Sequence, residues 1–294
     1  MEMKSKHHSE SQRHITVAAE IKIDLQHIGN CAQPSTRTGD SGCCRTKEII
    51  RHKSHCIGDK NLFAQTCNET PDSFSDGGKF NGMDAAIAHA HQMVEEGVDI
   101  IDVGGESTRP GHIQITDEEE IARVTPIIEV LKKEFDVPVS IDTYKSHVAE
   151  AALQAGADLV NDIWGLKYDS EMGAVIAKYD VACCLMHNKS NTEYNNFLID
   201  MLSETQECVN LARQAGIKDE KIMLDPGIGF GKTFEMNLEA MNHLELFQNL
   251  GFPVLLGTSR KSMIGLALDL PVDQRVEGTL ATSVIGVMKG CSFV

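Results

Sequence analysis

The sequence has no apolar run of about eighteen residues, the length that a membrane-spanning helix needs. Its first residues, MEMKSKHHSESQRH, lack the apolar stretch of a secretory signal. The nine cysteines include no pair at the CxxC spacing, so reduced thiols are expected in place of a disulfide framework. We therefore expect a soluble, cytoplasmic protein.

Basic residues are scarce in most of the chain. Residues 1–67 hold 10 of the 27 lysines and arginines but only 7 of the 43 acidic residues, which leaves 17 basic and 36 acidic residues beyond. Such an excess of negative charge disfavours contact with nucleic acid or an anionic membrane. An anionic substrate would have to be bound by a few well-placed donors.

From residue 83 onward, helical patterns alternate with short apolar runs. Each run is nearly all apolar, which is typical of strands buried on both faces of a parallel sheet. The expected strands are 62–67, 98–104, 137–142, 157–163, 181–187, 221–227, 252–257 and 291–294. Eight strands joined by helices predict an α/β fold, a (β/α)8 TIM barrel.

The two ends of the sequence depart from this pattern. Residues 1–61 show neither helical nor strand periodicity, and we expect an irregular, poorly ordered extension before a barrel domain at 62–294. The eighth strand begins at Cys291 and the sequence ends at Val294. We expect a C-terminally truncated barrel whose last strand is incomplete and whose eighth helix is missing.

Polar residues stand where the apolar runs stop. In a TIM barrel the carboxyl ends of the strands form one rim, where the reactive groups lie. The rim would bring together Asn68, the segment 104–109, Asp142, Asn161, Met186, Asp225 and the segment 259–261. An aspartate at such a position can also be the cap of the next helix, and for Asp142 alone both interpretations stay open.

The side chains on this rim suit a flat heterocycle and a phosphate. Asp225 can accept two hydrogen bonds from an amino-pyrimidinone edge, Asn161 can donate and accept, and Lys261 can donate to a ring atom. Thr108 and Arg109 follow two glycines in a loop that suits a phosphate. The segment 226–233 resembles a P-loop but has proline where that motif needs its first glycine, so we interpret it as a glycine-rich wall beside a flat ligand.

Six segments resemble the dihydropteroate synthase family, in the family's order. They are TPDSFSDGGKF (70–80), DVGGESTRPG (102–111), SIDTYK (140–145), NDIWG (161–165), LDPGIGFGK (224–232) and GTSRKSMIG (257–265). The resemblance covers about residues 68 to 294 and implies a transferase of folate biosynthesis that is a sulfonamide target. Such an enzyme condenses (7,8-dihydropterin-6-yl)methyl diphosphate with p-aminobenzoate, with the help of Mg2+.

The resemblance also implies the roles of individual residues. Asn68 would contact the metal and the diphosphate, and Asp142, Asp225 and Lys261 would be catalytic groups of the pterin pocket. The substrate-binding set comprises Thr108, Arg109, Asp142, Asn161, Met186, Asp225, Phe230, Gly257 and Lys261, with Pro71, Phe74 and Ser262 on the arylamine side. The expected partners are these two small substrates, with no nucleic acid or membrane and with a possible homodimer.

Two other interpretations stay open. A pterin-binding methyltransferase could share the barrel and its strand-end aspartate and asparagine. A catalytically impaired fragment that still binds pterin is the second alternative, because the family's strand-8 Arg-x-His does not occur before Val294. On that ground we expect lower activity than that of a complete family member.

Overall fold

The computed structural model describes residues 64–68, 79–107 and 113–294, with side chains omitted at 64–68 and 79–82. Six parallel strands pair in sequence order: β1 (Ala64–Asn68), β2 (Ile100–Gly104), β3 (Val139–Asp142), β4 (Leu159–Asp162), β5 (Ala182–Met186) and β6 (Ile222–Asp225). The order continues through single bridges from Leu224 to Val254 and from Leu255 to Phe293. The expected boundary between residues 61 and 62 lies outside the described residues.

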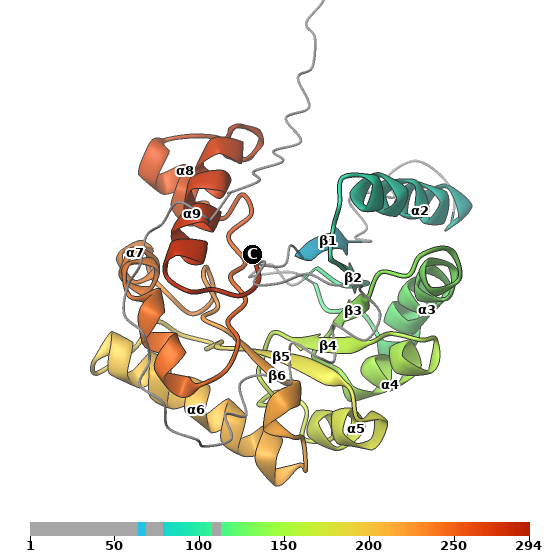
Figure 1. The fold of residues 1–294 in the computed structure, drawn as a ribbon, viewed down its shortest axis with the longest axis horizontal. Coiled ribbons are helices and arrows are strands. Elements are labelled where there is room, and N and C mark those ends of the chain that lie inside the picture. Colours follow the sequence, from blue (N-terminus) through green and yellow to red (C-terminus); the bar gives the residue numbers. More distant parts are fainter. Residues whose placement is uncertain (1–63, 69–78, 108–112) are drawn as a thin grey trace, which may run out of the picture. The chain divides into compact units, whose positions relative to one another are not determined.

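Helices connect the strands and lie outside them (Figure 1). The α-helices are α2 (Lys79–Glu95), α3 (Asp117–Glu134), α4 (Ser146–Gln154), α5 (Met172–Tyr179), α6 (Phe197–Gln214), α7 (Phe234–Asn242), α8 (Ser262–Leu268) and α9 (Val276–Met288). Short 3-10 helices occupy η4 (Asp219–Lys221), η5 (Leu244–Leu250) and η6 (Val272–Gln274). This succession agrees with the predicted α/β barrel: six of the eight expected strands form, and bridges at Val254 and Phe293 mark the positions of the other two.

Local sequence explains where several helices begin. Thr116 caps α3 by accepting a hydrogen bond from Glu119 N at 3.2 Å. Asn196 and Thr233 cap α6 and α7 in the same way. Helix α4 begins after Lys145 without a side-chain cap, so Asp142 is not a helix cap.

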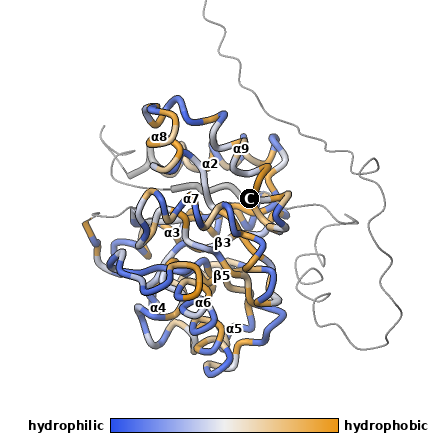
Figure 2. Tube along the Cα trace, turned by 90° about the vertical axis from the view of Figure 1, so that its left-hand side faces the viewer, coloured by the Kyte–Doolittle hydropathy of each residue, from blue (hydrophilic) through white to orange (hydrophobic). Residues whose placement is uncertain are grey.

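Residues that face outward from the strands pack against the helices. Ile101, Val103, Ile141, Val160 and Leu185 belong to one buried cluster with side chains of α3, α4 and α6. Hydrophilic stretches follow the outer helices α4, α5 and α6, where they alternate with hydrophobic ones (Figure 2). Among the described residues, no helix has the length and apolar character needed to cross a membrane.

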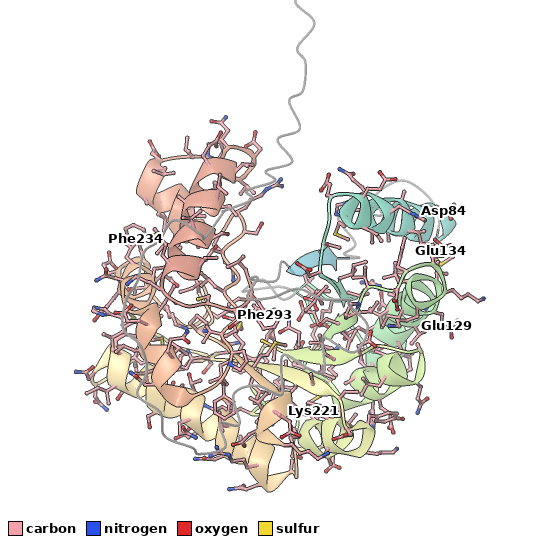
Figure 3. The ribbon with its side chains drawn as sticks, in the orientation of Figure 1. Asp84, Glu129, Glu134, Lys221, Phe234 and Phe293 are labelled. Carbon is pink, nitrogen blue, oxygen red and sulfur yellow. The ribbon has the colours of Figure 1, made fainter. Side chains whose placement is uncertain are left out.

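Residues that face inward change character along the strands. Ile100, Leu159, Ala182, Cys184, Met223 and Phe293 form an apolar cluster within the ring of strands. Phe293 lies near the middle of the ring, whereas Asp84 and Glu129 lie on the outer helices α2 and α3 (Figure 3). Because strand side chains alternate, the inward positions nearer the carboxyl ends are Asp102, Ser140, Asp142, Asn161 and Asp225. The polar layer therefore lies at the rim where the sequence predicts the site.

Candidate active site

The strand register places the predicted polar residues at one level. Asn68 pairs with Gly104, Gly104 with Asp142, and Asp142 with Asn161. On the far side of the rim, Met186 pairs with Asp225. The fold thus brings together residues that are separated by up to 157 positions in the sequence.

The polar layer also contains Asp102, which lies inside β2 and was not among the strand-end residues selected from the sequence. Asn161 Nδ2 donates a hydrogen bond to Asp102 Oδ2 at 3.2 Å. Three buried polar atoms in the described part of the chain have no hydrogen-bond partner: Asp102 Oδ1, Ser140 Oγ and Asp142 Oδ1. Buried polar atoms are normally satisfied, so this group on two neighbouring strands fits a site for a polar ligand.

The carboxyl groups of this layer are held in an unusual electrostatic environment. Burial raises the pKa of Asp142 well above its usual range, and the neighbouring charges of Asp102 and Glu120 add to the effect. Burial also raises the pKa of Asp102, against the opposing effect of the hydrogen bond from Asn161. Several neighbouring carboxyl groups with strongly shifted pKa values are typical of a functional site.

Asp225 is oriented by the backbone of the turn that follows β6. Its Oδ1 accepts a hydrogen bond from Gly227 N at 2.7 Å. Burial raises its pKa, while the Gly227 amide and the cations Lys261 and Lys232 act in the opposite direction. One carboxyl oxygen is fixed by the turn, and Oδ2 remains for a ligand.

Lys261 lies beside the same turn. Its Nζ donates a hydrogen bond to Ile228 O at 2.6 Å and lies 4.2 Å from the centre of the Phe230 ring. Burial lowers the pKa of Lys261, and the charges of Asp225 and Asp142 raise it in part. A lysine poised between two carboxyl groups and an aromatic ring can donate a hydrogen bond to a heterocycle.

Apolar side chains border the polar layer. Tyr144, Ile163 and Met186 form a small buried cluster, and Trp164 and Phe230 pack against it. Gly257 adjoins Asp225: a Cβ added to Gly257 would lie 3.8 Å from Asp225 Oδ2 and, apart from its chain neighbours, within 4 Å of no other atom of the described residues. The space beside Asp225 is therefore open where a flat ligand would need it.

The structure describes some of the predicted site residues and not others. It brings together Asp142, Asn161, Met186, Asp225, Phe230, Gly257 and Lys261, and Ser262 is the exposed first residue of α8. Pro71, Phe74, Thr108 and Arg109 lie outside the described residues, as does the side chain of Asn68. Asp102 could have been found in the sequence, because it is a single acidic residue inside an otherwise apolar strand.

Lys232 shows why the segment 226–233 is not a phosphate loop. Its Nζ donates hydrogen bonds to Gly227 O at 2.9 Å and to Phe230 O at 3.0 Å, so it points into the protein. The P-loop lysine, in contrast, reaches a phosphate. The structure thus agrees with the interpretation of this segment as a wall.

The burial of His187 makes the stability of the fold depend on pH. It is fully buried, and burial, followed by the charge of Lys232, lowers its pKa to about 3. An unfolded histidine titrates near 6.5, so the unfolded chain binds a proton that the folded chain does not bind between about pH 6.5 and 3. The stability contributed by His187 is complete above this range and is lost as the pH falls through it.

We expect the urea midpoint of His187→Gln to fall less than that of the unchanged protein between pH 7 and pH 4. Buried aspartates with raised pKa values, such as Asp162 at about 6, oppose this trend in both proteins and cancel in the comparison. If the urea midpoint of both proteins changes by the same amount between pH 7 and pH 4, His187 does not titrate as inferred.

A (β/α)8 barrel with carboxyl, amide and lysine groups on its carboxyl rim is the architecture of a pterin-binding enzyme, and the model of the family described as "Pterin binding enzyme" matches residues 64–294. The dihydropteroate synthase of Clostridium beijerinckii is 62% identical over 246 residues, covering 83% of this chain and 91% of the relative. That of Bacillus subtilis is 52% identical and covers 84% and 87%.

Solved structures agree with these relatives. A dihydropteroate synthase from Clostridium difficile, crystallised in the presence of pteroic acid, has a TM-score of 0.79 and 50% identity, covering 81% of this chain and 90% of that one. One from Xanthomonas albilineans with 4-aminobenzoic acid has a TM-score of 0.76 and 38% identity, covering 80% and 86%. The chain belongs to the dihydropteroate synthase family.

Proposed function

We propose that this protein condenses (7,8-dihydropterin-6-yl)methyl diphosphate with p-aminobenzoate to give 7,8-dihydropteroate and pyrophosphate. The observation that carries the proposal is the layer at one rim of the barrel in which Asp142 and Asp225 are buried and Asn161 and Lys261 are half-buried. Family membership supports the same reaction, since relatives with 62% and 52% identity are dihydropteroate synthases.

The pterin would lie between the polar layer and the apolar wall. Asp225 Oδ2 would accept from the amino-pyrimidinone edge, Asn161 would donate and accept, and Lys261 would donate to a ring atom. Met186 and Phe230 belong to the apolar cluster that would face the flat ring. The unsatisfied Oδ1 atoms of Asp102 and Asp142 would find donors on the pterin or on water bound with it.

The diphosphate would be bound by residues at the neighbouring strand ends, Asn68, Thr108 and Arg109. Among the described side chains, no group of three or more His, Cys, Asp and Glu could hold a metal ion. Mg2+ would be carried by the substrate phosphates and by one protein oxygen, that of Asn68, because Mg2+ usually keeps several waters and few protein ligands. When bound, the ion would offset the charge of the leaving diphosphate.

The arylamine would approach from the side of Pro71, Phe74 and Ser262. The bond between the pterin methylene carbon and the diphosphate oxygen breaks, pyrophosphate leaves with the electron pair, and the amine nitrogen forms the new bond and loses a proton. Positive charge that develops on the pterin would lie beside the carboxyl groups of Asp142 and Asp225 and would favour their ionised forms, against the burial that raises their pKa values. A sulfonamide that mimics the arylamine would compete for the same side.

Substitution of Gly257 tests whether the open space beside Asp225 holds the pterin. A Cβ at this position meets only Asp225 Oδ2, at 3.8 Å, so the fold should accept alanine and valine. We expect Gly257→Ala to weaken binding of the pterin diphosphate severalfold and Gly257→Val to weaken it at least about 30-fold, with urea midpoints close to that of the unchanged protein. Calorimetric titration measures both affinities, and equal affinity for all three proteins would place the pterin elsewhere.

The same titration separates the alternatives. An enzyme forms dihydropteroate when p-aminobenzoate and Mg2+ are added to the pterin complex, whereas an impaired binder gives the binding heat without product. A pterin-binding methyltransferase would bind the pterin but would leave p-aminobenzoate unchanged.

A further inference from the structure

The turn that follows β6, residues 226–231, adopts a backbone that glycine makes possible. Gly227, Gly229 and Gly231 have φ values of 66°, 88° and 55°. A Cβ on Gly227 would lie 1.9 Å from His187 O, and one on Gly231 would lie 2.6 Å from Lys189 O. This β6 turn is therefore packed directly against the backbone that follows β5.

One face of the β6 turn contacts groups of the candidate site. Gly227 N orients Asp225, and Ile228 O accepts the hydrogen bond of Lys261 at 2.6 Å. Phe230, whose ring lies under the Lys261 ammonium, belongs to the turn itself. The shape of the turn thus decides where three of the predicted pterin contacts lie.

The other face of the turn is held by Lys232, which is almost fully buried. Its Nζ contacts Gly227 O at 2.9 Å, Phe230 O at 3.0 Å and His187 Nδ1 at 2.9 Å. An ammonium group has three hydrogens, and here three acceptors surround it. Lys232 joins both ends of the turn to His187.

The tautomer of His187 follows from its other contact. His187 Nε2 lies 2.8 Å from Glu204 Oε2, and Lys189 Nζ donates to Glu204 Oε1 at 2.8 Å. The contacts with Lys189 and His187 keep the pKa of Glu204 below its usual value despite burial, so the carboxylate only accepts. Nε2 then carries the proton, and Nδ1 is left to accept from Lys232.

We propose that Glu204, His187 and Lys232 are positioning residues that fix the β6 turn in the shape that presents Asp225, Phe230 and Lys261 to the pterin. The inference rests on the proposed function, because it assumes that the pterin binds against this turn. None of the three side chains needs to touch the substrate. Lys232 donates hydrogen bonds both to the turn and to His187, and His187 in turn donates to the Glu204 carboxylate.

The test measures the affinity of pterin diphosphate for Lys232→Met, which keeps the length of the side chain and removes its donors. We expect affinity to fall at least about tenfold at a temperature where circular dichroism shows the variant folded. Glu204→Leu should also weaken binding. The double variant Lys232→Met with Glu204→Leu should bind no more weakly than Lys232→Met alone, because both changes interrupt the same series of hydrogen bonds.

Two controls separate positioning from general loss of stability. Lys178→Met removes an exposed ion pair with Glu150, away from the turn, so its affinity should stay within about twofold of that of the unchanged protein. Val148→Ala opens a cavity in the core at α4, away from the turn, and should lower the urea midpoint without changing affinity.

The proposal is overturned if folded Lys232→Met binds the pterin within twofold of the unchanged protein, or if Val148→Ala weakens binding equally. Should Lys232→Met not fold, Glu204→Leu and His187→Gln decide the question by the same measurement. Failure of the unchanged protein to bind pterin diphosphate would contradict the proposed function instead.

Discussion

Replacing Asp225 by asparagine is expected to lower kcat/KM for the pterin diphosphate about 100-fold or more. The asparagine carbonyl can still accept from Gly227 N, so the β6 turn keeps its 2.7 Å hydrogen bond. The second oxygen, beside Gly257, becomes an amide that donates and therefore opposes the donors of an amino-pyrimidinone. Loss of such a buried charged contact costs about 3 kcal/mol or more, which corresponds to this fold-change.

Asp219→Asn is the matched control for this variant. Asp219 forms a bidentate pair with Arg213 on the surface, at 2.8 Å for each contact, and lies in η4. The same chemical change there should leave kcat/KM unchanged. Steady-state rates at several pterin concentrations measure both variants, and a loss below threefold in Asp225→Asn would remove Asp225 from the pterin site.

Lys145→Met is expected to give the largest loss of stability, about 3–5 kcal/mol, which is the usual cost of breaking a buried ion pair. Lys145 Nζ donates to Glu106 Oε2 at 2.6 Å, to Glu120 Oε2 at 2.8 Å and to Ile115 O at 2.8 Å. The side chains of Lys145, Glu106 and Glu120 are only 5%, 3% and 2% exposed. Methionine fills a similar volume but removes the ammonium group that the two carboxyl groups share.

Urea unfolding measures this loss, with Lys178→Met as its control. Lys178 pairs with Glu150 at 2.6 Å, but its side chain is 64% exposed, and such surface pairs contribute little to stability. Adding Glu106→Gln and Glu120→Gln to Lys145→Met should restore part of the lost stability, because neutral amides tolerate burial better than carboxylates. A midpoint shift in Lys145→Met no larger than that of Lys178→Met would contradict the account of this cluster.

The sequence predicted the rim of the site because strand ends and barrel topology are local and regular. Asp142, Asn161 and Asp225 are the last or next-to-last residues of their strands, where the parallel register brings them together. Asp102 lies inside β2, and only the alternation of inward and outward side chains reveals that it joins Asn161. A rule restricted to strand ends could not find it.

Other features depend on tertiary contacts that leave no periodic signal. Lys145 meets Glu106 and Glu120 across 39 and 25 positions, and Lys232 meets His187 across 45. Helix α8 has seven residues, too few for a helical pattern to be recognised before the longer α9. Helix α2 begins at Lys79, four residues before the apolar pattern begins at Met83.

Formation of product from the two proposed substrates tests the central claim most directly. Purified protein is mixed with (7,8-dihydropterin-6-yl)methyl diphosphate, p-aminobenzoate and Mg2+, and dihydropteroate and pyrophosphate are quantified together by chromatography. The account predicts equal amounts of both products, abolished by omission of p-aminobenzoate and strongly reduced in Asp225→Asn. Binding of the pterin without any dihydropteroate, under conditions where the Bacillus subtilis relative turns over, would contradict it.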